Sequence, residues 1–351
     1  MKALHLDRAG GPLRLVELAD PEPGPGEALV RVHAAGICRS DVHYRAGDPR
    51  LPPLPRVLGH EISGTVAALG PKTTGCSPGD RVGVHYQTSC GECPPCLEGG
   101  EQFCVEGAMI GNHRDGGFAE YVVVPASNLV SLPQSVDFDS AAIMMCSSAT
   151  SLHALRRARL RSGETVAVYG LGGLGFSALQ LARWLGASDV VGVDIDQGKV
   201  ERARRMGFDA VDASEEDPVA AIQALGGADV ALELIGLPLT TTQALQSLRP
   251  RGRAAIVGLT GSATEVAMYD DLMRRETELI GVMDHLYAEL VELMEIAQAG
   301  GLDLSGIVSR TVPLDAGAVN RALDDLESFG GDIRTVIHPG APAQPFSTPS
   351  I

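Results

Sequence analysis

The pattern of hydrophobic and polar positions changes character near residue 148 of this chain. Before that point, short runs of alternating or β-branched residues are separated by turns rich in Gly and Pro. This pattern predicts a β-rich, barrel-like region of short strands. The clearest of these runs cover 28–32, 64–68, 81–85 and 119–124.

From residue 148 the pattern alternates between strand-like apolar runs and helix-like amphipathic segments. The predicted strands cover 165–169, 189–194, 230–234 and 254–257, and the predicted helices cover 148–159, 174–185 and 199–206. Strands that alternate with helices indicate βαβ units and a parallel sheet. After residue 285 the pattern predicts a helix over 287–299, a strand over 333–337 and a Pro/Ser-rich, mobile tail from Gly340.

Composition narrows the functional classes. A chain of 351 residues is long enough for about two domains. The formal net charge of −16 disfavours binding to nucleic acids and to anionic membrane surfaces. The chain has no apolar run of the roughly 20 residues that a membrane helix needs, and its N-terminus lacks the apolar core of a secretory signal. We therefore expect a cytoplasmic protein whose seven cysteines stay reduced.

Four cysteines lie close together in a segment that we call the cysteine lobe, residues 90–104. They are Cys90, Cys93, Cys96 and Cys104. Two-residue spacing lets neighbouring thiolates turn onto one ion, and four thiolates complete the closed shell of a structural zinc. The alternatives are two disulfides or four unrelated buried thiols. A zinc ribbon that binds nucleic acid is disfavoured by the negative charge of the chain.

A glycine-rich turn follows the predicted strand 165–169 and opens the predicted helix after it. Its residues are Gly170, Leu171, Gly172, Gly173, Leu174 and Gly175. This placement is the context in which such a motif binds the pyrophosphate of a dinucleotide at a helix N-terminus. Asp194 ends the next predicted strand, where a carboxylate accepts hydrogen bonds from the adenine ribose. The same charge, with Asp196 nearby, repels a 2′-phosphate, so NAD is favoured over NADP.

Two further motifs are ambiguous when each is taken alone. Cys38 lies in Gly-Ile-Cys-Arg-Ser-Asp-Val-His (36–43), and His60 lies in Gly-His-Glu (59–61). An isolated buried cysteine is more often a small hydrophobic residue than a metal ligand.

Taken together and in order, these motifs resemble those of the zinc-dependent medium-chain alcohol dehydrogenases along nearly the whole chain. The resemblance implies a catalytic zinc on Cys38, His60 and Cys146, and a structural zinc in the cysteine lobe. Two thiolates and a neutral imidazole leave one position open, as a catalytic zinc requires. Polyol dehydrogenases of the family often have Glu at the place of Cys146, and other members have Asp. Cys76 falls outside both sets and is interpreted as a packing residue.

The resemblance also implies roles for residues around these ligands. Ser40 and His43 match a proton relay from the substrate oxygen to solvent. Asp41 matches the residue that orients His60, and Glu61 lies next to the metal in relatives. The residues implied to contact the cofactor are Gly170, Gly172, Gly173, Leu174, Gly175, Asp194, Lys199, Arg39 and Arg334. Tyr86 matches an aromatic residue that lines the substrate pocket.

The implied fold is α/β, with a co-chaperonin-like, β-rich catalytic domain (1–147 and 286–351) and a doubly wound Rossmann domain (148–285). The implied reaction is NAD-linked oxidation of a primary or secondary alcohol to the aldehyde or ketone, and its reverse, in a homodimer or homotetramer. Two zinc ions per subunit are expected. A dehydrogenase for polyols, threonine-like amino-alcohols or aldehydes remains open, as does a non-enzymatic cofactor-binding protein. A zinc-free quinone reductase is disfavoured, because its members lack the set Cys38, His60 and Cys146.

Overall fold

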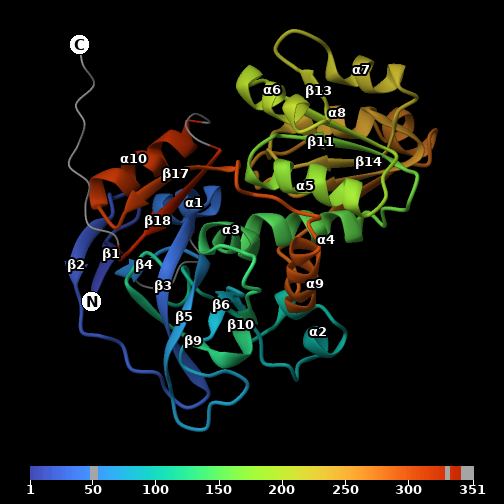
Figure 1. Cartoon of the computed structure of the whole chain (residues 1–351). Coiled ribbons are helices and arrows are strands. Elements are labelled where there is room, and N and C mark those ends of the chain that lie inside the picture. The colour runs from blue at the N-terminus through green and yellow to red at the C-terminus, as the bar shows by residue number, and fades with distance from the viewer. Residues whose placement is uncertain (48–53, 329–332, 341–351) are drawn as a thin grey trace, which may run out of the picture. The chain divides into compact units, whose positions relative to one another are not determined.

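The structure is a computed structural model that describes residues 1–47, 54–328 and 333–340. The chain divides into two compact units (Figure 1). Unit 1 comprises Met1–Cys146, Leu286–Gln298 and Leu304–Ile351, and unit 2 comprises Ser147–His285 and Ala299–Asp303. The sequence pattern places 299–303 in the catalytic domain, whereas in the structure these residues belong to unit 2. In the structure Gln180 binds this segment through hydrogen bonds to the backbone of Asp303.

Unit 1 is dominated by β-structure. Its strands are β1 (Lys2–Leu6), β2 (Arg14–Glu17), β3 (Glu27–Ile37), β4 (Arg56–Val57), β5 (Glu61–Leu69), β6 (Arg81–Val84), β7 (Gln87–Thr88), β8 (Ala108–Met109), β9 (Tyr121–Pro125), β10 (Leu129–Ser131), β17 (Val308–Pro313) and β18 (Arg334–His338). Its helices are α1 (Arg39–Ala46), α2 (Pro94–Leu97), α3 (Phe138–Ile143), α9 (Tyr287–Gln298) and α10 (Ala316–Glu327). One-turn 3₁₀ helices cover Glu101–Phe103 and Ala126–Asn128.

Strand β3 organises the main sheet of unit 1. The strand order is β10-β6-β5-β3-β18-β17, and β9 also pairs with β3. β18, from the C-terminal end of the chain, runs antiparallel to the last residues of β3. The pairing of β3 with β5 places Gly36 opposite Glu61, and a Cβ at position 36 would collide with the Glu61 carboxylate. This glycine therefore makes room for a buried acidic side chain beside the end of β3.

Unit 2 contains one six-stranded parallel sheet. Its strands are β11 (Thr165–Tyr169), β12 (Asp189–Asp194), β13 (Asp209–Asp212), β14 (Ala228–Glu233), β15 (Leu248–Ile256) and β16 (Glu278–Gly281). Its helices are α4 (Ala149–Arg157), α5 (Gly173–Trp184), α6 (Gln197–Arg205), α7 (Pro218–Ala224), α8 (Pro238–Gln246) and a π-helical segment Met268–Met273. Helices pack on both sides of the sheet (Figure 1), so the predicted doubly wound fold is confirmed.

The strand order in unit 2 is β13-β12-β11-β14-β15-β16. β11, β12 and β13 follow one another from the middle of the sheet to one edge strand. β14, β15 and β16 then follow one another from the middle to the other edge strand. β11 and β12 have the predicted bounds. Strands that are buried on both faces consist of continuous apolar runs, which makes their ends easy to recognise in the sequence. The carboxyl ends of β11 and β14 lie side by side at this reversal, which is where open α/β sheets bind ligands.

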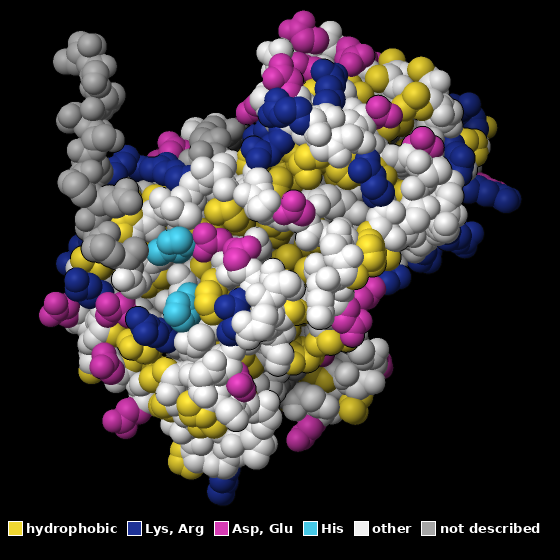
Figure 2. Space-filling view, in the orientation of Figure 1, with side chains coloured by type: hydrophobic (Ala, Val, Ile, Leu, Met, Phe, Trp, Pro, Cys, Tyr) yellow, Lys and Arg dark blue, Asp and Glu magenta, His cyan; other side chains and the backbone are white. Residues whose placement is uncertain are grey.

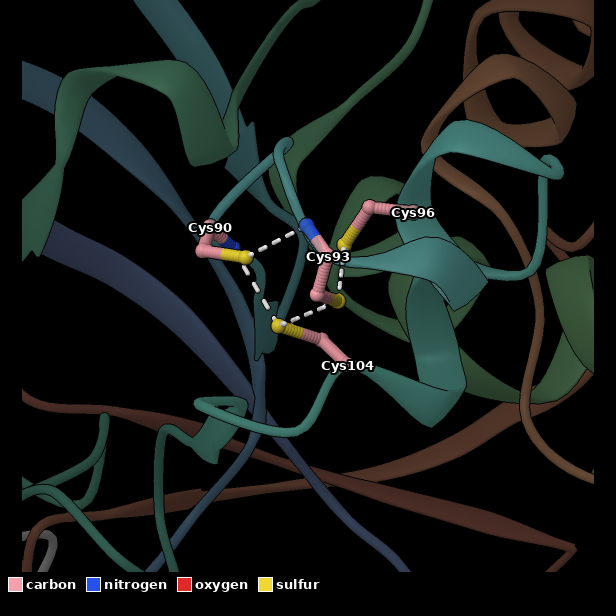
Figure 3. A group of neighbouring side chains, drawn as sticks. All are labelled: Cys90, Cys93, Cys96 and Cys104. Carbon is pink, nitrogen blue, oxygen red and sulfur yellow. Dashed lines mark hydrogen bonds between the residues drawn. The ribbon is translucent and has the colours of Figure 1, made fainter.

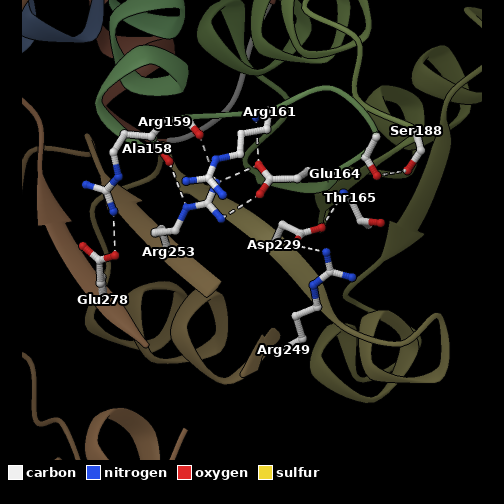
Figure 4. A network of polar contacts seen from close by, with 11 residues as sticks. Ala158, Arg159, Arg161, Glu164, Thr165, Ser188, Asp229, Arg249, Arg253 and Glu278 are labelled. Carbon is white, nitrogen blue, oxygen red and sulfur yellow. Dashed lines mark hydrogen bonds and ion pairs between the residues drawn. The ribbon is translucent and has the colours of Figure 1, made fainter. Parts of the chain in front are cut away.

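Side chains at the amino ends of the strands of unit 2 form a polar network (Figure 4). The buried Arg253 guanidinium donates to both carboxylate oxygens of Glu164, at 2.9 and 2.7 Å, and to the carbonyl of Ala158. Asp229 accepts from the backbone N–H of Thr165 and pairs with Arg249. This network stabilises the amino ends of the strands, which lie at the opposite end of the sheet from the glycine turn.

None of the described helices has the length and hydrophobicity needed to cross a bilayer. On the face that Figure 2 shows, acidic and basic side chains are interspersed.

Candidate metal centres and dinucleotide site

The four thiols of the cysteine lobe converge on one point (Figure 3). Their sulfur atoms lie within 4.8 Å of one another, with 3.4 Å between Cys93 and Cys96 and 3.8 Å between Cys93 and Cys104. Four sulfurs around zinc at about 2.3 Å would lie about 3.8 Å apart in a tetrahedron. All four cysteines are free thiols, so the disulfide alternative is not what the structure contains.

The backbone and charge of the lobe favour a bound cation. Backbone N–H groups donate to the sulfurs of Cys90 and Cys104, at 3.3 and 3.2 Å. Backbone N–H groups, first that of Cys96, lower the pKa of Cys93 to about 6, whereas desolvation followed by the Cys93 thiol raises the pKa of Cys96 to about 12. Residues 90–104 contain no Lys, Arg or His. Four thiolates here would therefore need a metal ion as their counter-charge.

A second cluster gathers Cys38, His60, Glu61 and Cys146, each supplying one donor atom within 4.8 Å of the others. The four come from three separate places in unit 1. Cys38 follows β3 and begins α1, His60 and Glu61 stand at the start of β5, and Cys146 lies on the π-helical turn Met144–Ser148 after α3. All four are buried. The structure thus brings together the three ligands that the resemblance implied.

His60 is held in one orientation by its surroundings. Its Nδ1 lies 3.2 Å from Oδ1 of the buried Asp41, and the ring of Tyr86 packs edge-on at 5.1 Å. Nε2 has no hydrogen-bond partner in the described part of the chain. A histidine bound through Nδ1 to a carboxylate, with Nε2 directed at two thiols, has the arrangement of a metal ligand.

The protonation states of this cluster are strongly perturbed. A hydrogen bond from Cys146 outweighs burial and lowers the pKa of Cys38 well below its ordinary value, and the same bond, with burial, raises the pKa of Cys146. Burial opposes protonation of His60, but the Asp41 carboxylate outweighs it and raises the pKa of His60. A divalent cation bound here would displace protons from the thiols and the imidazole, because metal ligands must be deprotonated.

Glu61 and Arg334 form a buried ion pair beside the cysteines. Burial raises the pKa of Glu61 to about 7, and the Arg334 charge works against this rise. We expected Arg334 to bind the cofactor pyrophosphate, and the pairing with Glu61 was not anticipated. The Gly-His-Glu motif could have indicated that a buried Glu61 needs a positively charged partner. It could not have identified Arg334, which lies 273 residues away.

Ser40 and His43 lie one turn apart on α1, so that they share a helix face. Ser40 Oγ lies 3.8 Å from the sulfur of Cys38. The side chain of His43 is exposed to solvent. Arg39, on the same helix, donates to the carbonyl of Leu326 at 2.8 Å, a contact within unit 1 that the sequence did not reveal.

The glycine turn in unit 2 has the tight geometry that its sequence predicts. Gly170 has φ +98°, and a Cβ on Gly175 would collide with the carbonyl of Gly170. Nothing lies within 4 Å of a Cβ built on Gly172, so this side of the turn is open to a ligand. Gly173 and Leu174 form the first turn of α5, and the free N–H groups at such a helix N-terminus can bind a phosphate.

Asp194 closes the turn from the neighbouring strand. Its two carboxylate oxygens accept the backbone N–H groups of Leu171 at 2.7 Å and Asp196 at 2.9 Å. Lys199, on α6, lies with its Nζ 3.9 Å from the carboxylate of Asp196. Asp194 thus places a carboxylate at the end of β12, where dinucleotide-binding sheets have an acid for the adenine ribose.

Sequence reasoning did not single out Glu233. This fully buried acid ends β14, next to the end of β11. A charged residue at the carboxyl end of a mostly apolar strand was the available signal.

Comparisons with known proteins agree with this geometry. Residues 24–134 match the family model described as the alcohol dehydrogenase GroES-like domain, and residues 173–299 match that of zinc-binding dehydrogenases. The co-chaperonin-like part of the expected fold is thereby confirmed.

Individual relatives cover almost the whole chain. An NAD-dependent alcohol dehydrogenase of Sulfurisphaera tokodaii is 32% identical over 97% of this chain and 100% of its own length. The structure of a protein described as a zinc-binding dehydrogenase, from Sinorhizobium meliloti 1021 and bound to NADP, is 31% identical, with a TM-score of 0.88 and coverage of 96% and 99%. That of 2R,3R-butanediol dehydrogenase from Bacillus subtilis is 26% identical, with a TM-score of 0.87 and coverage of 97% and 99%. The chain belongs to the zinc-dependent medium-chain alcohol dehydrogenase family of oxidoreductases.

Proposed function

We propose that this protein is a zinc-dependent, NAD-linked dehydrogenase that oxidises a small primary or secondary alcohol to the aldehyde or ketone and catalyses the reverse reaction. The observation that carries the proposal is the convergence of Cys38, His60 and Cys146 from three separate elements, with their donor atoms within 4.8 Å. Two sulfurs and one imidazole nitrogen suit zinc and leave a fourth position for a substrate.

In this proposal each residue near the metal has one task. Cys38, His60 and Cys146 hold a zinc ion, which when bound acts as a Lewis acid on the substrate oxygen. Asp41 keeps Nδ1 of His60 engaged, so that Nε2 faces the cluster. Glu61, paired with Arg334, places a buried carboxylate beside these ligands.

Ser40 and His43 would carry the substrate proton away. Ser40 Oγ is close to the sulfur of Cys38 and can accept a proton from an oxygen held beside it. His43 lies on the same face of α1 and is exposed, so it can pass that proton to water. Tyr86, packed against His60, would form part of the substrate wall.

The glycine turn, Asp194 and Lys199 would bind the dinucleotide in unit 2. The turn leaves an open face at Gly172, and Asp194 brings a carboxylate to the end of β12. This acid favours NAD, whose ribose offers a 2′-hydroxyl, over NADP, which brings a 2′-phosphate. Arg39 and Arg334 remain our candidates for binding the pyrophosphate. Unit 1 would be the catalytic domain and unit 2 the dinucleotide-binding domain.

The cysteine lobe would hold a second, structural zinc. Its four thiols saturate a tetrahedral ion and leave no position for substrate. Two zinc ions per subunit follow. The free thiols throughout the described chain fit a reducing compartment such as the cytoplasm, and the family resemblance favours a homodimer or homotetramer.

The likeness to a butanediol dehydrogenase keeps a polyol substrate in view, with amino-alcohols and aldehydes as further candidates. Cys146, where polyol enzymes of the family often have Glu, favours simple alcohols. A non-enzymatic cofactor-binding role ranks low, because the metal cluster and the glycine turn are both intact.

The test is a panel of primary, secondary, polyhydric and amino-alcohols with NAD, together with metal analysis. We expect two zinc ions per chain and formation of NADH with at least one alcohol. His60→Ala should abolish turnover and remove one zinc. His5 lies in β1 and belongs to neither metal cluster, so His5→Ala should change neither the turnover nor the zinc content. Fewer than two zinc ions, or turnover that survives His60→Ala, would contradict the mechanism. Bound NAD and full zinc without any turnover would instead support the non-enzymatic role.

A further inference from the structure

Glu233 has an unusual position for a charged residue. Its side chain is 0% exposed, and it is the last residue of β14, in register with Tyr169 at the end of β11. The strand order reverses between these two strands. Ligands of doubly wound sheets bind at this reversal, outside the carboxyl ends of the strands. A buried carboxylate therefore lies beneath the expected dinucleotide site.

One oxygen of this carboxylate carries all its hydrogen bonds. Oε1 accepts from the backbone N–H groups of Ile235 and Gly236, both at 2.9 Å, and lies 2.7 Å from Oγ1 of Thr240. Oε2 has no partner in the described part of the chain. Burying a polar group costs free energy unless hydrogen bonds compensate for it, and here the three donors to Oε1 provide that compensation.

These three donors belong to the turn that follows β14 and to the first turn of α8. The N-cap residue of α8, Leu237, makes no side-chain cap, so Oε1 of Glu233 supplies the acceptor there. The backbone carbonyl of Glu233 also accepts from Val257 and Gly258 at the end of β15. Glu233 thus ties the ends of two neighbouring strands together.

The turn held by Glu233 lies directly against the glycine turn. A Cβ on Gly170 would meet the side chain of Ile235 at 2.7 Å, and one on Gly236 would collide with the carbonyl of Leu259. The turns after β11, β14 and β15 therefore support one another in close contact. A shift of the 234–236 backbone would move the wall opposite the phosphate-binding glycines.

We propose that Glu233 is a positioning residue of the dinucleotide site: its Oε1 fixes the 234–236 turn against Gly170, so that the carboxyl edge of the sheet is preformed for the cofactor. The inference rests on the proposed function. It requires only the acceptor oxygen, because Oε2 receives no hydrogen bond. An amide in the same place therefore keeps the interaction, and a methyl group loses it.

The experiment measures NADH binding to the purified, zinc-loaded protein by fluorescence titration, with thermal stability recorded in parallel. Glu233→Ala should raise the Kd for NADH about tenfold or more, as expected when hydrogen bonds to a charged acceptor are lost. Glu233→Gln should bind NADH within about threefold of wild type. In steady state, Glu233→Ala should raise the KM for NAD while leaving the KM for the alcohol nearly unchanged.

Asp229 provides a matched control. It is a second buried acid on β14, at the amino end of the strand, where it accepts from Thr165 N–H and pairs with Arg249 (Figure 4). Asp229→Ala should lower thermal stability, as Glu233→Ala does, yet bind NADH as wild type does. If Glu233→Ala does not fold, Thr240→Val removes one of the three donors and should weaken NADH binding about threefold in a folded protein.

Several results would overturn the proposal. The first is wild-type affinity for NADH in Glu233→Ala, and the second is an equal loss of NADH affinity in Glu233→Ala and Asp229→Ala. The third is a Glu233→Gln variant that binds NADH as weakly as Glu233→Ala. If Glu233→Ala does not fold, unchanged NADH affinity in Thr240→Val would count in the same way. Failure of the proposed function looks different, because the wild type itself would then not bind NADH.

Discussion

Asp41 joins two of the clustered metal-ligand candidates through its two carboxylate oxygens. Oδ1 lies 3.2 Å from Nδ1 of His60, and Oδ2 accepts the backbone N–H of Cys38 at 2.9 Å. The same side chain therefore orients one ligand and caps the helix that begins at the other.

Asp41→Ala should weaken binding of the catalytic zinc about 10- to 100-fold, because the imidazole loses the partner that fixes its orientation. The measurement is zinc release to a competing chelator, in which only one of two zinc ions should become labile. Asp139→Ala is the matched control, since it removes the carboxylate 2.6 Å from His338, a histidine outside the cluster. Equal zinc retention in both variants would contradict the role of Asp41.

The two metal clusters should respond differently to loss of a cysteine. Cys96→Ser should lower the Tm and release one zinc, because the lobe has no other counter-charge for its thiolates. Cys146→Ser should reduce kcat/KM by more than about 100-fold in a protein that still folds. Loss of a metal ligand should lower activity more than loss of a residue that only hydrogen-bonds to a ligand, which costs about 10- to 100-fold. Cys76→Ser, outside both clusters, should change neither property. A fully active Cys146→Ser enzyme would be incompatible with this assignment.

Asp194 should set the preference between NAD and NADP. Asp194→Asn keeps an acceptor for the Leu171 N–H but removes the charge that repels a 2′-phosphate. The ratio of kcat/KM for NADP to that for NAD should rise about tenfold or more. Asp212→Asn, opposite Asp194 in the register of β12 and β13, is the control and should leave the ratio unchanged. A wild-type enzyme that already prefers NADP would refute the assignment.

The pair of Arg253 and Glu164 should contribute to stability in a pH-dependent way. Burial opposes ionisation of Glu164, but the hydrogen bonds from Arg253 and from the Arg161 N–H outweigh it and lower its pKa. A lowered pKa means that the stabilisation is complete above the ordinary glutamate value of about 4.3 and is lost as the pH falls through the folded-state pKa.

Glu164→Gln should therefore cost about 1.5–3 kcal/mol of unfolding free energy at neutral pH, and the difference from wild type should shrink as the pH falls below about 4. Thermal unfolding across this pH range gives the measurement. Glu278→Gln breaks the half-exposed pair with Arg159 in the same network and should cost about 0–1 kcal/mol (Figure 4). A constant difference between wild type and Glu164→Gln down to pH ~3 would contradict the linkage.

Local patterns made much of this protein predictable. The strands β11 and β12 appear as unbroken apolar runs, the glycine turn has a fixed spacing, and the four lobe cysteines lie within 15 positions of one another. These features depend on neighbours in sequence. The cluster of Cys38, His60 and Cys146 was accessible only through family resemblance, because no local spacing connects its members.

Other features depend on partners that sequence patterns do not connect. The ion pair of Arg334 with Glu61 joins residues 273 positions apart, and it forms only because β18 pairs with β3. The π-helical turn that presents Cys146 gives no periodic signal. The role of Glu233 depends on how three turns meet at one edge of a sheet, which tertiary contacts decide.

The pairing of β18 with β3 also has a consequence for biosynthesis. Every strand of unit 2 leaves the ribosome before β18 does, whereas the last residues of β3 must wait for a partner from the far end of the chain. Until then the nascent protein exposes an unpaired strand edge, which is prone to association with other chains. Glu61 likewise lacks its counter-charge until Arg334 has been translated. The metal-binding unit can therefore be completed only after every strand of unit 2 has been synthesised.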